Sequence, residues 1–591
     1  MKRRLLATCL VLVAAGAASL CGRAEAQWNS CGVGLTFELA DQNVPVACPD
    51  GAGGAIVAWA DHRTTTPFGT PRWLIYAQHV DALGAAQWTA DGIPAAPDNV
   101  AADTLADQTV PTVLADGSGG AFIAWVDGRE YPYSDIYVQH LNAAGSPLWG
   151  ARGLPACAAV NVQQNPVLVS DGAGGIIVAW QDCRNGTNFD IYAQRLDASG
   201  APQWTLNGVA LCLAPNSQYR PRIVPDGAGG AIVCWYDYRS LIGVSGNSDI
   251  YLQRVNASGV PQWATDGILA FQVQSGEQIL PNMIPDGAGG AILAYQDSRS
   301  GLSYDIYAQR VDGNGALLWD PSIGVPVCSA ANNQSNPVLC TDNANGAIIA
   351  WQDQRKGANV DADIYAQRVT GAGAVAWTAN GVPVCVEPPA TPTGNQWYPS
   401  IVSSGASGGA IIVWYDARNV GPNLYTQYLD ATGAPIWTTN GVLICGQPYG
   451  GSAHDMVSNG AGGAIIVWQD GRNQNTDIFA ARVDNAGGLG APSTQLGVGD
   501  PRTGGLALGA PHPNPTARAM TVAFTLPGEG PATIDLVDVA GRLVERHAVG
   551  AMGAGSHSLT LGRESRLPAG LYFVRLTRGA TTLTARTAVV P

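Results

Sequence analysis

The sequence Asp171-Gly172-Ala173-Gly174-Gly175-Ile176-Ile177-Val178-Ala179-Trp180-Gln181-Asp182-Cys183-Arg184, followed by Asp190-Ile191-Tyr192-Ala193-Gln194-Arg195, is the clearest copy of a segment that the chain contains eight times. Each copy has an aromatic residue at the place of Trp180, and successive copies lie 54 to 66 residues apart. A period of this size is typical of repeat architectures. The eight aromatic residues are Trp59, Trp125, Trp180, Trp235, Tyr295, Trp351, Trp414 and Trp468.

Each copy has the pattern of four short strands. The first strand ends at a glycine-rich turn such as Asp171–Gly175, where glycine adopts positive φ without steric cost. The second strand is apolar without alternation, which indicates burial on both faces. The third is Asp-Ile-Tyr-Ala-Gln-Arg, and the fourth carries a Trp followed by Gly-Val. Sheets buried on both faces need neighbours on both sides, and a ring of sheets, the β-propeller, provides them.

The phase of the repeat predicts how the ring closes. Trp28 begins a fourth-strand pattern before the first complete copy, whereas the eighth copy lacks its fourth strand after residues 477–483. We therefore expect residues 28–36 to complete the last sheet. The prediction is an all-β chain whose residues 27–487 form an eight-bladed β-propeller closed by an N-terminal strand.

The turn before each fourth-strand Trp supports this geometry. Asp197-Ala198-Ser199-Gly200-Ala201-Pro202-Gln203-Trp204 resembles the tryptophan-docking motif of eight-bladed quinoprotein dehydrogenases, although it is one residue shorter. The resemblance implies that each of these tryptophans is wedged between adjacent sheets. The adjacent cysteines that those enzymes carry beside their cofactor are absent from this sequence.

The first 26 residues have the pattern of a signal peptide. Lys2, Arg3 and Arg4 precede an apolar run, and residues 24–26 offer a small-x-small cleavage site. The alternative is a lipoprotein anchored at Cys21, but Leu20 is larger than the residue that lipoprotein processing prefers before the cysteine. No later stretch has 18 consecutive apolar residues, so we expect no transmembrane segment.

Charge and cysteine usage narrow the class further. The chain has a formal net charge of −14, and an acidic protein repels phosphate backbones, so nucleic acid is not expected as a partner. Export permits disulfides. Five cysteines nevertheless share one repeat position and should be too far apart to pair with one another, which favours a role as small buried residues. They are Cys157, Cys212, Cys328, Cys385 and Cys445.

The C-terminal part is different. Residues 488–510 are rich in Gly, Pro, Ser and Thr and are predicted to be a linker, and residues 511–591 have the strand spacing of a small Ig-like β-sandwich. Pro513-Asn514-Pro515, Asp538-Val539-Ala540-Gly541-Arg542 and Ala569-Gly570-Leu571-Tyr572 together resemble the C-terminal sorting domain of type IX secretion, which is related to the Ig-like domain of the flagellar hook-capping protein.

This resemblance implies that the type IX secretion machinery binds residues 511–591 and that the protein passes through the periplasm and outer membrane to become secreted or surface-attached. The chain ends without the basic residue often found near the end of that family. A purely structural Ig-like module remains the alternative.

Catalytic and metal-binding patterns are missing from the sequence. An Asp-x-Arg pair, such as Asp182 and Arg184, ends the second strand of all eight copies. A catalytic pair belongs in one place, so we interpret these pairs as hydrogen-bonded braces for the loop to the third strand, with the Asp of Asp-Ile-Tyr as a further partner. We therefore predict no catalytic residue, no metal site and no cofactor.

Variation between the copies points to one face of the ring. Length changes fall in the connections between strands two and three and between copies, which emerge on the same face of a propeller. Exposed aromatic residues on a face built of loops suggest glycan or protein binding, although they could equally pack the loops down. The candidate ligand-binding residues are Trp73, Tyr131, Tyr133, Tyr219, Arg220, Trp397 and Tyr398.

These observations favour an exported, non-enzymatic binding or adhesion protein that recognises an extracellular glycan or protein through its loop-rich face. Two alternatives remain open. One is a secreted polysaccharide-active enzyme with catalytic groups in the same loops, and the other is a structural surface component.

Overall fold

The fold is known from a computed structural model, and the backbone contacts divide it into two compact units, Met1–Pro492 and Ser493–Pro591. The expected signal peptide, Tyr131 and most of the expected linker lie outside the described residues. The structure describes residue 28 and residues 31–490 and 507–589, apart from residues 66–70, 97–106, 131, 240–247, 272–275, 302, 358–361, 387–393, 406–407, 419–422, 446–449, 473–474, 509–519, 527–529, 540, 553–554, 563–566 and 580.

The described part of the first unit consists of eight four-stranded antiparallel sheets, numbered here by the chain order of their first strands. Sheet 1 contains β2 (Gln42–Pro49), β3 (Ala55–Thr65), β4 (Pro71–Val80) and β5 (Ile93–Pro94). Sheet 2 contains β6 (Gln108–Ala115), β7 (Ala121–Asp127), β8 (Asp135–Leu141) and β9 (Leu154–Cys157). Sheet 3 contains β10 (Gln163–Ser170), β11 (Ile176–Asp182), β12 (Asp190–Leu196) and β13 (Val209–Cys212). Sheet 4 contains β14 (Gln218–Pro225), β15 (Ala231–Asp237), β16 (Asp249–Val255) and β17 (Ile268–Leu269).

The remaining four sheets repeat this plan. Sheet 5 contains β18 (Gln278–Pro285), β19 (Ala291–Asp297), β20 (Asp305–Val311) and β21 (Val325–Cys328). Sheet 6 contains β22 (Gln334–Thr341), β23 (Ala347–Asp353), β24 (Asp363–Val369) and β25 (Val382–Cys385). Sheet 7 contains β26 (Gln396–Ser403), β27 (Ala410–Asp416), β28 (Asn423–Leu429) and β29 (Val442–Cys445). Sheet 8 contains β30 (Gly450–Ser458), β31 (Ala464–Asp470), β32 (Asp477–Val483) and β1 (Val33–Gly34).

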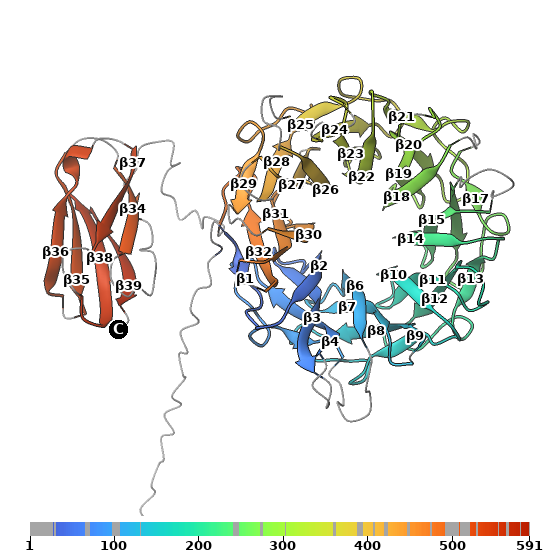
Figure 1. Ribbon diagram of the computed structural model, residues 1–591, viewed down its shortest axis with the longest axis horizontal. Helices are drawn as coiled ribbons and strands as arrows, with labels where there is room; N and C mark the ends of the chain where they lie inside the picture. Colours follow the sequence, from blue (N-terminus) through green and yellow to red (C-terminus); the bar gives the residue numbers. More distant parts are fainter. Residues whose placement is uncertain are drawn as a thin grey trace, which may run out of the picture. The chain divides into compact units, whose positions relative to one another are not determined.

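The eight sheets follow one another around a ring, with the first strand of each sheet innermost (Figure 1). This arrangement is consistent with a β-propeller. The N-terminal segment supplies the fourth strand of sheet 8, because Val33 of β1 lies opposite Ala480 of β32 and the amide of Leu35 donates to the carbonyl of Ile478 at 2.8 Å. The N-terminal segment that precedes the first repeat copy is therefore joined to the last copy by strand pairing.

Apolar side chains fill the space between successive sheets. The second strands carry this core, and Ile176 to Asp182 of β11 are all buried. Trp180 is fully buried beside Gly208, where a Cβ atom would lie 2.6 Å from the indole ring, so only glycine fits there. The cluster around Trp235 combines Val233 of sheet 4 with Val169 and Ala193 of sheet 3. The uninterrupted apolar pattern of these strands thus reflects burial on both faces.

A second set of tryptophans, which the docking-motif resemblance placed between adjacent sheets, links neighbouring sheets by hydrogen bonds. Each indole Nε1 donates to a main-chain carbonyl in the turn between the third and fourth strands of the next sheet. The eight bonds, of 2.9 to 3.3 Å, are Trp28 to Ala82, Trp88 to Ala143, Trp149 to Ala198, Trp204 to Ala257, Trp263 to Gly313, Trp319 to Gly371, Trp377 to Ala431 and Trp437 to Asn485.

The described residues of the second unit, taken by themselves, are also all β apart from the short 3₁₀ helix η1 (Gly550–Met552). Residues of both its sheets, including Phe524, Ile534 and Val574, form one buried core. Its strands are β33 (Ala507–Leu508), β34 (Met520–Leu526) and β37 (Gly555–Leu561) in a three-stranded sheet, and β36 (Leu543–Ala548), β35 (Ala532–Asp538), β38 (Gly570–Arg578) and β39 (Thr581–Val589) in a four-stranded sheet.

Candidate functional site

The repeated Asp-x-Arg pair is a structural brace. In sheet 3, Asp182 accepts hydrogen bonds from the indole of Trp180 at 2.7 Å and from the guanidinium of Arg184 at 2.6 and 2.9 Å. Arg184 also donates to the carbonyl of Asn207 at 2.8 Å and stacks 3.6 Å from the ring centroid of Tyr192. The pair therefore ties the second strand to the third and fourth. In the Asp-Ile-Tyr motif, the contact that we observe for the arginine is with the tyrosine ring.

The first strands carry the unusual feature of this fold. In seven of the eight sheets, the residue directly before a proline in the first strand has a left-handed backbone with φ between 50° and 53°. A bulge in the pairing with the second strand coincides with each of them. Bulges of this kind redirect side chains. The seven residues are Val44, Val110, Asn165, Arg220, Leu280, Asn336 and Tyr398.

This conformation is costly, and neighbouring sheets help to hold it. A positive φ is a genuine outlier for a β-branched residue such as Val44, and such strain costs about 1–3 kcal/mol and clusters at functional sites. The amide of Arg220 donates to Gln181 Oε1 of sheet 3 at 3.0 Å, and the amide of Asn336 donates to Gln296 Oε1 of sheet 5 at 2.8 Å. The seven positions hold five residue types, Val, Asn, Arg, Leu and Tyr, while the backbone stays constant.

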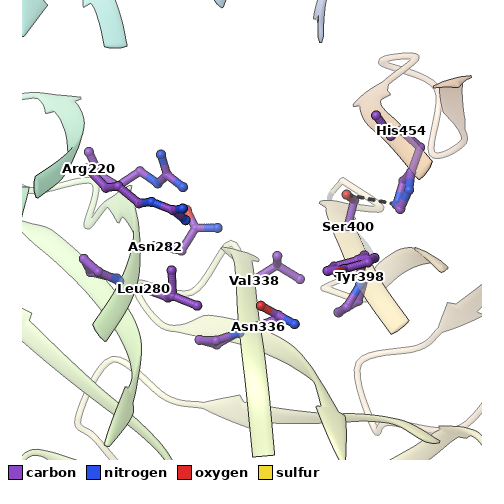
Figure 2. Close-up of a pocket in the computed structure, with 13 residues that line it drawn as sticks. Arg220, Leu280, Asn282, Asn336, Val338, Tyr398, Ser400 and His454 are labelled. Atoms are coloured by element: carbon purple, nitrogen blue, oxygen red, sulfur yellow. Dashed lines mark hydrogen bonds between the residues drawn. The ribbon is translucent and has the colours of Figure 1, made fainter. Parts of the chain in front are cut away.

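The left-handed residues of sheets 4 to 7 line a pocket of about 350 Å³ on the inner side of the ring, here called the axial pocket (Figure 2). It lies near the loop-rich end, because Gln218, two residues before Arg220, pairs with Asp237 where the second strand ends. The 13 lining residues are Arg220, Arg222, Leu280, Pro281, Asn282, Asn336, Pro337, Val338, Tyr398, Pro399, Ser400, Ala453 and His454.

One end of the axial pocket is cationic. Arg220 and Arg222 are both exposed to solvent, and within the described residues neither guanidinium has a recorded ion pair or hydrogen bond. Arg195, in contrast, pairs with Asp171 at 2.9 Å, as its counterparts in sheets 4 to 6 do with theirs. Among the described residues that line the axial pocket, none is a carboxylate.

The opposite end combines a hydroxyl, an imidazole and an aromatic ring. Ser400 Oγ lies 3.3 Å from Nε2 of His454, and the ring of Tyr415 meets His454 edge-on at 4.8 Å. Burial lowers the pKa of His454 to about 4, so the imidazole is neutral at physiological pH. Within the described residues no carboxylate hydrogen-bonds to His454, whereas a nucleophile–base pair needs a third group to orient the base. The contact suits ligand binding better than nucleophilic catalysis.

The candidate residues from the sequence fall into two groups. Arg220 and Tyr398 lie together in the axial pocket, and Tyr398 is 54% exposed. The others lie elsewhere. Trp73 stacks on His62 at 4.4 Å, and Trp397 packs, partly buried, against the core of sheets 7 and 8.

The tyrosine candidates also divide. Tyr219 contacts Phe189, Tyr236 and Tyr238 in an aromatic cluster, with ring centroids 5.6 to 5.9 Å apart. Tyr133 is 43% exposed and is not part of the axial pocket, and Tyr131 lies outside the described residues. The contacts of Trp73, Trp397 and Tyr219 are those of residues that pack loops and strand ends.

Five polar residues of the axial pocket were not among the residues predicted from the sequence. Each lies within two residues of the first-strand proline or takes the corresponding place in sheet 8, at positions that differ between copies. That variation, next to an otherwise repeated Gln-x-x-Pro, is the signal that could have found them. They are Arg222, Asn282, Asn336, Ser400 and His454.

Comparison with known families explains the C-terminal unit. Residues 511–590 match the secretion system C-terminal sorting domain, which confirms the resemblance inferred from the Pro-Asn-Pro, Asp-x-x-Gly-Arg and Ala-Gly-x-Tyr motifs. The protein is therefore exported through the type IX secretion system, to the cell surface or the medium, and its sorting domain interacts with that machinery.

Two further observations concern membrane-spanning helices and metal-binding groups. None of the described helices has the length and apolar character needed to cross a membrane. A search of the described residues for groups of three or more His, Cys, Asp or Glu side chains able to hold a metal ion finds none.

Comparisons with solved structures give only distant likenesses, and no curated protein matches the chain. A puromycin hydrolase is 14% identical to this chain, with a TM-score of 0.38. The match covers 74% of this chain and 59% of the hydrolase. Prolyl oligopeptidase B from Galerina marginata is 12% identical, with a TM-score of 0.40 over 72% of this chain and 54% of its own. An endo-arabinase from Bacteroides thetaiotaomicron is 13% identical, with a TM-score of 0.27 over 44% of this chain and 92% of its own. These likenesses are too distant to carry an argument about function.

Proposed function

We propose that this protein is an exported, non-enzymatic binding protein whose residues 27–487 form an eight-bladed β-propeller that binds an extracellular glycan or protein at the axial pocket on its loop-rich face. Residues 1–26 are its signal peptide and residues 488–510 its linker. Residues 511–591 are an Ig-like domain for secretion and surface attachment.

One observation carries the binding role. Side chains that differ between the repeat copies converge from five first strands on one pocket. The rest of each repeat serves packing, docking or bracing, so the sequence differences collect where a ligand can reach them. Strained backbone held by neighbouring sheets at the same place is a further mark of a functional site.

Binding is tested with the purified chain on arrays of immobilised glycans and proteins. A variant with Asn336→Ala and Tyr398→Ala should lose at least tenfold in affinity for any ligand that the parent binds. Tyr133→Ala is the matched control, because Tyr133 is exposed outside the axial pocket. Equal binding by the parent and the double variant would move the site away from the axial pocket.

The polysaccharide-active enzyme is the second candidate, and the Ser400–His454 contact is the observation that favours it. Incubation of the protein with each array ligand, followed by chromatography for released products, separates the two functions. Turnover that is lost in Ser400→Ala would overturn the non-enzymatic assignment.

The export role has its own test. Deletion of residues 505–591 should leave a folded repeat unit that accumulates in the periplasm, detected by fractionation and circular dichroism. Release of the truncated chain into the medium at the parent's level would contradict a sorting role for these residues.

A further inference from the structure

The charge of the axial pocket is opposite to that of the chain that builds it. The whole chain carries a formal net charge of −14, yet the pocket presents two arginines and no carboxylate. Elsewhere in the repeat unit, the described arginines at repeated positions, apart from Arg482 of sheet 8, lie in brace or turn ion pairs, such as Arg184 with Asp182 and Arg195 with Asp171. In sheets 1 to 3 and 5 to 7, the places of Arg220 and Arg222 hold apolar or neutral polar residues, whereas Asp455 takes the place of Arg222 in sheet 8.

An uncompensated pair of guanidiniums selects an anion. Two adjacent like charges repel each other, and an anionic group placed between them relieves that repulsion. Guanidinium groups bind carboxylates through paired hydrogen bonds with defined geometry. The cationic end of the pocket is therefore suited to one carboxylate of a ligand.

The other residues that line the axial pocket indicate the chemistry of the rest of that ligand. Figure 2 shows Arg220 and Asn282 on one side of the pocket and Tyr398, Ser400 and His454 on the other, with Asn336 and Val338 between them. The amides and the hydroxyl can donate to and accept from sugar hydroxyls, and Tyr398 offers an exposed aromatic ring to a pyranose face. The volume, about 350 Å³, lies at the small end of ligand pockets, which favours a compact ring over a folded peptide.

We propose that the axial pocket binds a uronic acid unit of an acidic oligosaccharide, with Arg220 and Arg222 on its carboxylate and Tyr398 against its ring. This assignment rests on the proposed binding function and gives its ligand class. It predicts recognition of acidic sugar polymers rather than of neutral ones.

The test is isothermal titration of the full chain with trigalacturonate, its methyl-esterified form, neutral galactotriose and hexaglutamate. Trigalacturonate should bind, with affinity that falls as salt is added, and the esterified and neutral sugars should bind at least tenfold more weakly. Arg222→Gln and Arg220→Gln should each lower trigalacturonate affinity at least tenfold. Thr112→Ala is the matched control, since Thr112 takes the place of Arg222 in sheet 2 and lies outside the pocket.

Circular dichroism and thermal unfolding establish that each variant is folded, and Arg222→Lys, which keeps the charge, provides a second variant if Arg222→Gln is unstable. The inference is overturned if trigalacturonate does not bind, if the esterified sugar binds equally, if the arginine variants retain affinity, or if hexaglutamate binds more tightly. A neutral glycan that depends on Tyr398 but not on the arginines would overturn this inference and leave the proposed function standing.

Discussion

The indole Nε1 of Trp28 donates a hydrogen bond of 2.9 Å to the carbonyl of Ala82, which joins the N-terminal segment of sheet 8 to sheet 1. The two residues stand on either side of the seam where the first and last repeat copies meet. Each of the seven remaining pairs of neighbouring sheets has the equivalent indole-to-carbonyl bond. The first and last sheets are therefore linked by the same interaction as all the others.

We predict that Trp28→Ala destabilises the repeat unit by about 3–5 kcal/mol, because it removes a buried indole and its hydrogen bond at the seam. Urea unfolding followed by tryptophan fluorescence measures the loss. Leu39→Ala is the control in the same segment, since Leu39 is 96% exposed and should change little. An unchanged midpoint in Trp28→Ala would contradict closure by this segment.

Cys31 and Cys445 should form a disulfide in the exported protein. Their sulfur atoms are in contact at 2.6 Å and link the N-terminal segment of sheet 8 to sheet 7, and export passes through an oxidising compartment. Two thiols lose two protons and two electrons to a disulfide oxidant there, and the new bond stabilises by about 2–4 kcal/mol. Peptide mapping without reductant should find the linked peptides, and reduction should lower the midpoint.

Cys157→Ser is the control for Cys445→Ser, because Cys157 occupies the same repeat position but its sulfur contacts Asp182 and Arg184. Complete alkylation of both Cys31 and Cys445 in unfolded, unreduced protein would show that the bond does not form.

Alanine substitutions at two glycines distinguish the cost of a left-handed backbone from the cost of a steric clash. Gly172 and Gly200 both have positive φ, at 73° and 83°. A Cβ at Gly172 would meet nothing within 4 Å, whereas one at Gly200 would lie 2.4 Å from Leu154 Cδ1 and 3.0 Å from the Trp149 indole. Gly172→Ala should cost about 1–2 kcal/mol for the left-handed backbone alone, and Gly200→Ala should cost clearly more. Calorimetric unfolding compares them, and equal losses would mean that the indole does not pack tightly against this turn.

Sheet 8 has a buried arginine that its own turn does not satisfy. In sheet 3, the carboxylate of Asp171 pairs with the guanidinium of Arg195. The corresponding residues in sheet 8 are Asn459 and Arg482. Within the described residues, Nδ2 of Asn459 has no recorded hydrogen-bond partner, and the same is true of Nε and Nη1 of Arg482. Burial lowers the pKa of Arg482. Asn459→Asp should raise stability by about 1–3 kcal/mol by completing the pair. The reciprocal change Asp171→Asn should destabilise, and a stability loss in Asn459→Asp would refute the account.

Asp135 gives a pH-dependent prediction. Desolvation, and then the charges of Glu130 and Asp127, raise its pKa to about 7, and one of its carboxylate oxygens has no recorded partner within the described residues. Because the folded pKa lies above the unfolded value, the folded state binds the proton more tightly, and stability falls as pH rises from about 4 through 7. Asp135→Asn should therefore stabilise by about 1–2 kcal/mol at pH 8, and the gain should shrink toward pH 4.

Sheet 7 supports this substitution, since Asn423 already occupies the position of Asp135. Thermal unfolding across this pH range is the measurement. A gain that is the same at pH 4 and pH 8 would show that the ionisation of Asp135 is not its source.

The sequence was sufficient for the four-stranded repeat and for the pairing of the N-terminal segment with the last copy, because uninterrupted apolar strands and the phase of the repeat are local signals. It was not sufficient for the axial pocket. Arg222 and His454 lie more than 200 residues apart in the sequence and line the same pocket only when the ring is assembled. The left-handed backbone at Val44 and Tyr398 also runs against the preferences of those residue types, so no local rule would have placed it. Aromatic content alone could not distinguish Tyr398 in the pocket from Trp73 stacked on His62.

The left-handed residue before each first-strand proline separates recognition from folding within a single repeat. Its side chain varies between copies, as does the residue after the proline, while the glycine turns, the docking tryptophans and the Asp-x-Arg braces that hold the ring are contributed by other positions. A chain built in this way can acquire a different ligand through single substitutions made one sheet at a time, with no change to the contacts between sheets. The same seven positions offer a protein engineer a set of independent sites, arranged around one axis, for building new binding specificities on an unchanged scaffold.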